Sequence, residues 1–353
     1  MNWLNRIIYR PFFVRLMHWE YWPFNAVYIW LYPVWLYYCL RARSLFFFSA
    51  SNPGFENGGF LMESKKKIYD SMPRDLYPKT ILALPTDSDE EIIAKVKAEE
   101  ISFPLIAKPD IGGRGRGVKK IDCASDLIDY LRKFPFAMLV QEWVDYHQEI
   151  GIFYYRYPGQ PQGRISGIVG KKFLLLKGDG ISTMEGLLKK NKRYILQLPA
   201  LQESMQGQLQ EILRVNEERI LVPYGNHARG ALFLDNSAWI DEELEKTIDI
   251  ICQRVPGYYF GRLDIRYESL ELLKEGKCFS VIEINGAGSE PTHMYSQGHS
   301  LFFAWKEILR HWNILCKISR MNHALGTPYM CRAEGMKMFR AYKEYNRLFG
   351  FIK

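Results

Sequence analysis

The segment IAKPDIGGRGRGV, residues 106–118, constrains the fold more than any other part of the chain. An apolar, strand-like run ends at Lys108, and four glycines follow within the six positions from Gly112 to Gly117. Because glycine has no Cβ, such a stretch lets backbone N–H groups approach an anion closely. The pattern predicts a loop that contacts phosphate, and a plain surface hairpin with basic tips is the competing interpretation.

Two standard phosphate-binding motifs do not fit this loop. A Walker loop has Lys-Ser or Lys-Thr after its last glycine, whereas Val118 follows Gly117. A dinucleotide fingerprint opens a long helix, whereas the residues after Gly117 are strand-like. The remaining interpretation is a loop between two antiparallel strands that folds over a polyphosphate. Lys108 would reach a phosphate from the strand end, and Arg114 or Arg116 would add charge.

The composition limits the class of protein and its partners. Of 353 residues, 24% are charged and 48% are hydrophobic, which fits a globular protein and excludes a disordered chain. The formal net charge of +8 favours anionic partners such as nucleotides or acidic lipids. Nucleic acid is disfavoured, because the basic residues are spread along the sequence and the aromatic residues do not interleave with them. Six scattered cysteines without CxxC spacing indicate reduced thiols in a cytoplasmic protein.

The N-terminal region is rich in aromatic residues, and no residue from Tyr21 to Leu40 is charged. A helix of that length would cover about 30 Å, enough for a hydrocarbon core. Pro23 and Pro33 interrupt the run, and basic residues flank both of its ends. We therefore expect an interfacial or re-entrant segment at the cytoplasmic face of the inner membrane. A single-pass span and an aromatic element packed on the protein's own core remain open.

Mixed strands and helices with hairpin-like strand pairs predict an α+β fold rather than a regular βαβ succession. Ser125 is expected to cap one helix, and Ser182 with Glu185 to form a capping box on another. Helices are expected at 204–219, 241–254, 298–322 and 334–347, and strands at 103–108, 117–121, 137–143, 149–157, 164–174, 258–267 and 278–285. The expected divisions are an aromatic, basic, membrane-associating segment at 1–45, a short linker region at 46–100, a catalytic region at 101–325 and a C-terminal helix at 326–353.

Two later segments, YFGRLDIRY and FSVIEINGAG, carry acidic and amide side chains at alternating positions. Strand alternation places Arg262 and Asp264 on one face of the first, and Glu283 and Asn285 on one face of the second. If the two strands pair, two carboxylates and an amide oxygen converge beside an arginine. Hard cations such as Mg²⁺ prefer these oxygen ligands. The competing interpretation is a salt bridge between Glu283 and Arg262 on the sheet surface.

A third motif, QEWVDYHQEIGIF, follows an apolar strand that ends at Val140. Glu142, Trp143 and Val144 offer backbone edges for a purine, and Glu149 could accept hydrogen bonds from ribose hydroxyls. A plain strand–turn–strand with a central acid has the same pattern, so this motif alone does not identify a nucleotide site.

The order of these motifs resembles the ATP-grasp ligases, and in particular the D-alanine:D-alanine ligases and, through GDGISTMEGLL, the cyanophycin-synthetase and glutathione-synthetase-like branch. The resemblance covers roughly residues 64–295. It implies an ATP-grasp fold in which two α+β subdomains clasp ATP. It also implies a ligase that uses ATP and Mg²⁺, with Mn²⁺ as a possible substitute.

The resemblance assigns roles to residues by position. Arg262 would steady the transferring phosphoryl group, Glu149 would bind the ribose, and Lys65 would be a first nucleotide lysine, with Lys66 or Lys67 as alternatives. By the same resemblance, phosphates would contact Lys108, Lys172, Gly112, Gly113, Arg114 and Gly115, adenine would contact Glu142, Trp143 and Val144, and metal would bind Asp264, Glu283 and Asn285.

The implied reaction joins a carboxylate to an amine through an acyl phosphate. The small domain that usually precedes an ATP-grasp region is missing or shortened, and GSEPTHMYSQGHS replaces the expected substrate loop, so D-alanine:D-alanine ligation itself is not expected. Arg229 could bind a substrate carboxylate, and Glu290 or His293 could guide the amine, while His227 and His293 each fit ordinary hydrogen-bonded residues as well. The expected partners are small-molecule or lipid-linked carboxylates and amines and a membrane surface. An ATP-binding sensor or scaffold without turnover is the alternative.

Overall fold

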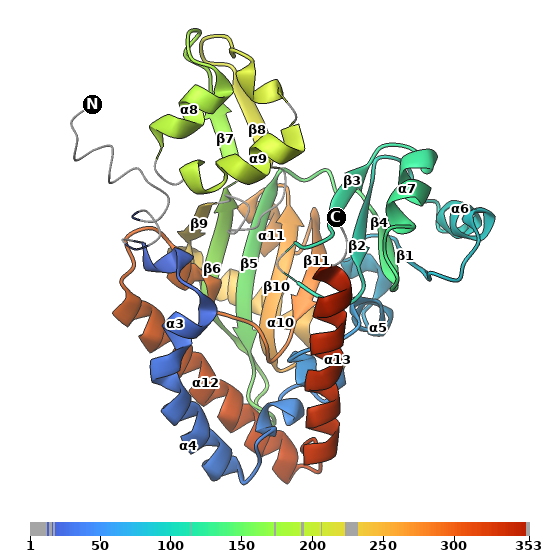
Figure 1. The fold of residues 1–353 in the computed structure, drawn as a ribbon. Helices are drawn as coiled ribbons and strands as arrows, with labels where there is room; N and C mark the ends of the chain where they lie inside the picture. Colours follow the sequence, from blue (N-terminus) through green and yellow to red (C-terminus); the bar gives the residue numbers. More distant parts are fainter. Residues whose placement is uncertain are drawn as a thin grey trace. The chain divides into compact units, whose positions relative to one another are not determined.

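The computed structural model describes residues 13, 16, 18–113, 115–172, 174–191, 194–205, 207–222 and 232–350 (Figure 1). The chain divides into two units. The first comprises residues 1–32, 171–234 and 294–305, and the second comprises residues 33–170, 235–293 and 306–353. The fold is α+β as expected, since antiparallel strand pairs and helices are mixed along the chain.

The first unit contains a two-stranded antiparallel sheet and several short helices. Its sheet pairs β7 (Leu174–Lys177) with β8 (Glu218–Val222). Buried leucines and a methionine fill the core between this sheet and the neighbouring helices. The helical elements are η1 (Trp19–Tyr21), α3 (Phe24–Tyr28), η2 (Ile29–Leu31), α8 (Met184–Lys190), η6 (Tyr194–Leu196), α9 (Leu198–Met205) and η7 (Gln208–Gln210).

Three details of secondary structure differ from the sequence-based expectation. The helix expected at 204–219 is wrong: Gly207 adopts a left-handed φ of 91°, the short turn η7 follows, and β8 begins soon afterwards. The capping box on Ser182 is wrong, because Thr183 is the N-cap of α8 and the Ser182 hydroxyl donates to Asp179 instead. Ser125 is not a cap either, since the helix α7 (Ala124–Leu131) begins one residue before it.

The second unit is built on two antiparallel sheets (Figure 1). The first sheet has the order β1-β4-β2-β3, and α6 (Asp89–Ala98) and α7 pack their apolar faces on it. Acidic residues occupy the first turn of α6, where they complement the helix dipole, and Ser88 forms a capping box with Glu91. The strands are β1 (Thr80–Ala83), β2 (Leu105–Pro109), β3 (Lys119–Ile121) and β4 (Met138–Glu142).

In the second sheet the strands follow the order β11-β10-β5-β6. Alternating side chains divide its two faces: Ile152 and Leu263 join the core with α10 (Glu242–Gln253), whereas Phe153 and Phe260 join the core with α12 (Leu301–Ala324). The strands are β5 (Gln148–Tyr155), β6 (Arg164–Lys172), β10 (Phe260–Tyr267) and β11 (Phe279–Asn285), while β9 (Leu232–Asp235) carries the chain from the first unit into the second. The remaining elements are α4 (Tyr32–Ala42), η3 (Phe47–Ala50), η4 (Glu56–Gly59), α5 (Lys65–Ser71), η5 (Arg74–Leu76), η9 (Ser237–Trp239), α11 (Leu270–Lys274), η10 (Thr292–Tyr295) and α13 (Arg332–Gly350).

The aromatic run from Tyr21 to Leu40 is divided among α3, η2 and α4. One side of α4 is buried, where Tyr38 and Cys39 pack with side chains of α12, while Leu36 and Leu40 on its other side are exposed. Among the described residues, no helix combines the length and the apolar character needed to cross a membrane.

Candidate functional site

The candidate phosphoryl-transfer residues lie directly opposite one another on β10 and β11. The two strands pair antiparallel, with Arg262 facing Asn285 and Asp264 facing Glu283, so the expected pairing is confirmed. Arg262 also donates two hydrogen bonds to Asp264, from Nε to Oδ1 and from Nη2 to Oδ2, each 3.0 Å long. The sequence pattern therefore produces a cluster of two carboxylates, an amide and a guanidinium on one face of the sheet.

Burial gives this cluster its electrostatic character. Asp264 is only 3% exposed. Burial disfavours the charged guanidinium of Arg262, but the attraction of Asp264 and Glu283 outweighs it and holds the pKa of Arg262 above its ordinary value. The guanidinium is therefore a fixed positive charge in a place that water screens weakly.

The donor set fits magnesium in its chemistry. Asp264 and Glu283 supply carboxylate oxygens, and Asn285 supplies an amide oxygen. Within the described residues, no three or more His, Cys, Asp or Glu side chains gather in a way that could hold a metal. Any metal here would therefore depend on the amide and on substrate oxygens besides the two carboxylates.

The structure distinguishes the three lysines of ESKKK. Lys65 is buried, and its Nζ lies 3.6 Å from Glu283 Oε1 and donates to the Gly112 carbonyl. Lys66 instead pairs with Asp70, and Lys67 pairs with Glu56. Lys65 is therefore the lysine that connects the acidic cluster to the glycine loop.

Glu63 belongs to the same cluster, although the sequence analysis did not single it out. Burial raises the pKa of Glu63, the charge of Lys65 opposes the rise, and Glu283 adds to it. The charge of Lys65 therefore acts on Glu63 as well as on Glu283. The sequence signal for Glu63 was its place two residues before Lys65.

Lys108 lies deep between the two sheets and uses all its donors internally. Its Nζ is 2.8 Å from Gln141 Oε1, 3.0 Å from Tyr69 Oη and 3.0 Å from the Ile282 carbonyl. Burial lowers the pKa of Lys108 to about 8, and nearby carboxylates, Glu283 first among them, act in the opposite direction. Tyr69 and Gln141 had no distinguishing sequence signal, because their role depends on a buried contact between distant segments.

The glycine loop connects β2 to β3, which pair antiparallel, as expected. Gly112 has a φ of +117°, a conformation that side chains rarely adopt, and its carbonyl faces Lys65. A Cβ built on Gly113 would meet no atom within 4 Å, so the backbone there is open to a ligand. Arg114 lies outside the described residues, and Gly115 is partly buried.

The C-terminal helix α13 holds this loop from one side. Tyr345 Oη donates to the Ile111 carbonyl at 2.6 Å, and Arg116 Nη1 donates to Asn346 Oδ1 at 2.8 Å. The Arg116 guanidinium also lies 4.1 Å from the centre of the Phe349 ring. The two ends of the glycine loop are therefore anchored on a helix that is more than 200 residues away in sequence.

The proposed purine edge carries an arginine that the sequence analysis did not assign. Arg266 Nη1 donates to the Val144 carbonyl at 2.9 Å, and Arg266 Nε lies 3.9 Å from Glu149 Oε2. The same guanidinium lies 4.9 Å from the centre of the Trp143 ring. Glu142 accepts from the backbone N–H of Lys79 at 3.3 Å. Strand alternation could have found Arg266, because it follows Arg262 and Asp264 on the same face of β10.

The remaining candidates are dispersed. His293 is buried and its Nε2 lies 3.0 Å from Glu307 Oε2 on α12, which is the ordinary hydrogen-bonded role. Glu290 is partly buried and contributes to the field at Arg262. Lys172 is the exposed last residue of β6 and belongs to the first unit. His227 and Arg229 lie outside the described residues.

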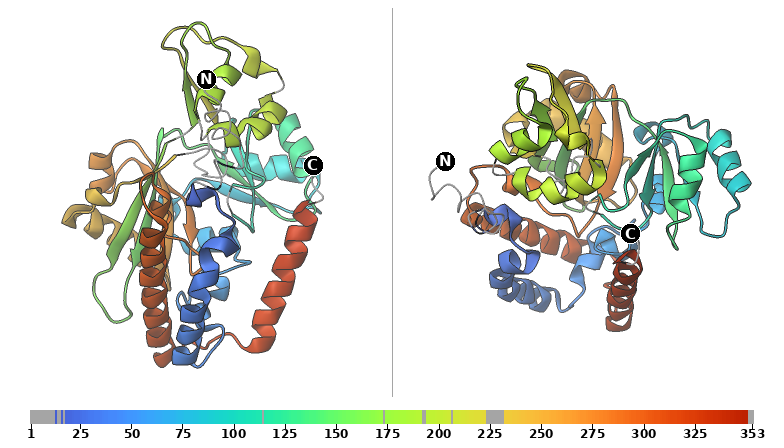
Figure 2. Two further views of the ribbon diagram at one scale, coloured as in Figure 1. Left: turned by 60° about the vertical axis from the view of Figure 1, so that its left-hand side comes forward. Right: turned by 45° about the horizontal axis from the view of Figure 1, so that its top comes forward.

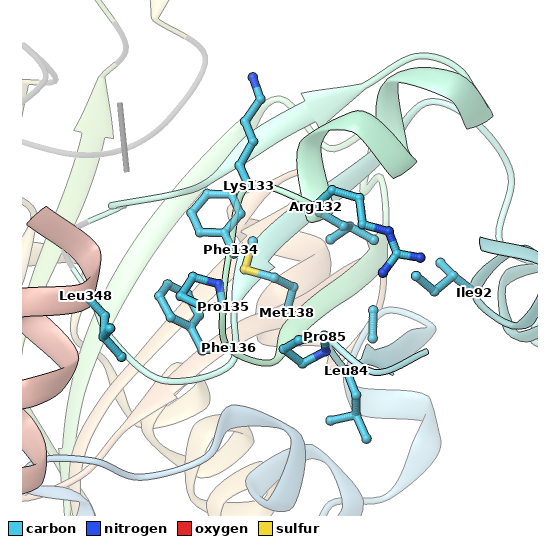
Figure 3. A pocket seen from close by; sticks show the side chains of 12 residues that line it. Leu84, Pro85, Ile92, Arg132, Lys133, Phe134, Pro135, Phe136, Met138 and Leu348 are labelled. Carbon is cyan, nitrogen blue, oxygen red and sulfur yellow. The ribbon is translucent and has the colours of Figure 1, made fainter. Parts of the chain in front are cut away.

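A pocket of about 560 Å³ lies elsewhere in the second unit (Figure 3). Leu84 and Pro85 after β1, Phe134 and Phe136 before β4, and Leu348 of α13 are among its lining side chains. None of the described site residues lines it. The largely apolar pocket is therefore separate from the charged cluster.

Comparisons with known proteins give structural similarities only. No family model matches the sequence, and no curated protein matches it. The chain is similar in structure to the bifunctional glutathione synthetase of Pasteurella multocida (14% identity, TM-score 0.38), covering 67% of this chain and 34% of that one. It is also similar to D-alanine–D-alanine ligases of Coxiella burnetii (11% identity, TM-score 0.40, 80% of this chain and 61% of that one) and Bacillus anthracis (12%, 0.42, 74% and 69%).

The chain thus spans about a third of the synthetase's length and under two thirds of the Coxiella ligase's length. At these identities the likeness is one of fold alone. The three solved structures named above are ATP-grasp ligases.

Proposed function

We propose that the chain is an ATP-dependent carboxylate–amine ligase whose catalytic region spans residues 101–325. The observation that carries this proposal is the register of β10 and β11, which sets Arg262 and Asp264 opposite Asn285 and Glu283. A purely structural ion pair would need only one carboxylate. The second carboxylate and the amide oxygen of Asn285 are ligands of the kind that a phosphoryl-transfer site with a hard cation uses.

In this proposal a carboxylate oxygen of the substrate attacks the γ-phosphorus of ATP, the bond to the β-bridging oxygen breaks, and ADP leaves. The amine nitrogen then attacks the acyl carbon, the carbon–oxygen bond breaks, phosphate leaves, and the nitrogen loses a proton. Asp264, Glu283 and Asn285 would hold magnesium, which offsets negative charge on the phosphate oxygens when bound.

The chain's own residues supply positioning and charge. Arg262 is fixed by its two bonds to Asp264, so it can stabilise charge on the transferring group without reorganising. Lys65 holds the Gly112 carbonyl, which leaves the exposed backbone of Gly113 to approach phosphate oxygens. No covalent protein nucleophile enters the reaction.

The test is ADP release with purified protein, ATP and magnesium, with and without panels of carboxylates and amines. Under the proposal, release requires both an acid and an amine, and product mass equals acid plus amine minus water. Asp264→Asn and Glu283→Gln should abolish it, and Lys67→Gln, which changes an exposed ion pair, is the matched control. Full turnover in Asp264→Asn would refute the assignment.

A second candidate is an ATP-binding sensor or scaffold without turnover. The observation that favours it is that these side chains already have hydrogen-bond partners within the chain. All three donors of Lys108 and both carboxylate oxygens of Asp264 form such bonds. ATP binding by calorimetry without ADP release across the substrate panel would establish this candidate and overturn the ligase.

We also propose that the aromatic N-terminal segment associates with the cytoplasmic face of the inner membrane, so that the substrate is lipid-linked or an envelope precursor. The exposed Ile29 and Trp30, at 57% and 72%, support this proposal. Ile29→Ser with Trp30→Ser should move the protein from the membrane fraction to the supernatant. Unchanged fractionation of the double variant would count against this segment as the anchor.

A further inference from the structure

Three chain segments far apart in sequence meet at one end of the second unit: the end of α4, the end of α12 and the start of α13 (Figure 1, Figure 2). Ser319 of α12 donates through Oγ to the Phe47 carbonyl at 2.6 Å. The Phe46 ring lies 6.2 Å from the Phe339 ring of α13. We call the surface formed by residues 36–45 and 317–343 the basic end.

The basic end holds nearly all of the chain's excess positive charge. Its sequence contains eight lysines and arginines and one acid, Glu334, a formal charge of +7 against +8 for the whole chain. Within the part of the chain that the structure describes, all eight cations are exposed and none forms an ion pair with a carboxylate. They are Arg41, Arg43, Lys317, Arg320, Arg332, Lys337, Arg340 and Lys343.

Large apolar side chains stand between these cations. Leu40 is 77% exposed and Leu325 is 74% exposed. Leu45, Met336 and Phe339 are 58%, 44% and 41% exposed. Single exposed apolar residues are common, but a group of them among unpaired cations marks an interaction surface.

We infer that the basic end docks on an anionic lipid bilayer. Cations next to an anionic surface gain electrostatic attraction, and aliphatic side chains among them gain by entering the headgroup and acyl boundary. A nucleic acid would use the cations but would offer little to Leu40 and Leu325, which project as aliphatic chains. Charge and apolar surface together therefore favour lipid over a polyanion.

This inference deepens the proposed membrane association by naming the surface and the lipid class, and it does not depend on ligase turnover. It adds α12 and α13 to a role that the sequence had suggested for residues 1–45 alone. Basic residues that are spread along the sequence lie together at the basic end of the folded chain.

The test is co-sedimentation of the full chain with phosphatidylcholine vesicles containing about 30% phosphatidylserine. The triple variant Arg320→Gln, Lys337→Gln, Arg340→Gln should bind about a hundredfold more weakly, since each basic residue contributes about fivefold. The control carries the same charge change at exposed positions elsewhere in the second unit, Lys97→Gln, Lys133→Gln and Lys246→Gln, and should bind as the parent protein does.

A second variant separates lipid from other polyanions. Leu40→Ser with Leu325→Ser should weaken vesicle binding while leaving heparin binding unchanged. Equal binding by the charge triple and its control would overturn the inference. So would unaltered vesicle binding by the leucine pair, because the surface would then be a general polyanion site. ADP release measured without vesicles reports separately on the ligase proposal.

Discussion

Replacing Lys108 with methionine tests whether its ammonium is buried as the structure shows. The folded protein releases this proton at a pKa of about 8, whereas the unfolded chain holds it to the ordinary value of 10.5. Between these values the unfolded chain binds more protons, so the free energy of unfolding rises with pH. Since each pKa unit corresponds to 1.36 kcal/mol, Lys108 raises the free energy of unfolding by about 3 kcal/mol across that interval. Lys108→Met lacks this contribution.

The assay is urea unfolding of both proteins at a pH below about 8 and again near 10.5. At each pH, the free energy of unfolding of the variant is compared with that of the parent protein. Subtracting the free energy of unfolding of the variant from that of the parent protein cancels the contributions of the other lysines, tyrosines and cysteines, because these groups titrate equally in both proteins. The exposed Lys246→Met on α10 is the control, and its difference from the parent should not change with pH. If the Lys108→Met difference is also constant, the lysine is solvated and its three internal hydrogen bonds do not persist in solution.

Three further predictions follow from the site and its support. Lys65→Met should raise the KM for ATP and leave the fold intact by circular dichroism. The variant loses the ammonium that contacts both Glu283 and the Gly112 carbonyl. Tyr345→Phe removes one hydrogen bond to the glycine loop, worth about 1 kcal/mol, so ATP affinity measured by calorimetry should fall by up to about fivefold. Burial lowers the pKa of His311 to about 3 from its ordinary 6.5, so the unfolded chain takes up the proton first and stability is lost as pH falls through that interval. Urea titrations of His311→Gln should show a shallower acid dependence than the parent protein.

The register of the site could be predicted from sequence because it depends on strand alternation. A period of two puts Arg262 with Asp264 and Glu283 with Asn285 on common faces, and antiparallel pairing follows from the short connection between the strands. The antiparallel pair around the glycine loop was predictable for the same reason: glycines separate two strand-like runs.

The surroundings of Lys108 could not be predicted in this way. Its acceptors come from Tyr69, Gln141 and Ile282, on three different elements, and no local pattern specifies which of them meet. The helix expected at 204–219 failed because Gly207 adopts a left-handed φ of 91° and the short turn η7 follows it. The sequence likewise could not show which lysine of ESKKK faces the site, because this depends on which side of α5 is buried.

The helix α13 has one end in the basic end and the other against the glycine loop, through Tyr345 and Phe349. At 1.5 Å per residue, its 19 residues span about 28 Å. One helix therefore contributes residues both to the surface proposed to bind lipid and, through Tyr345, to the support of the glycine loop.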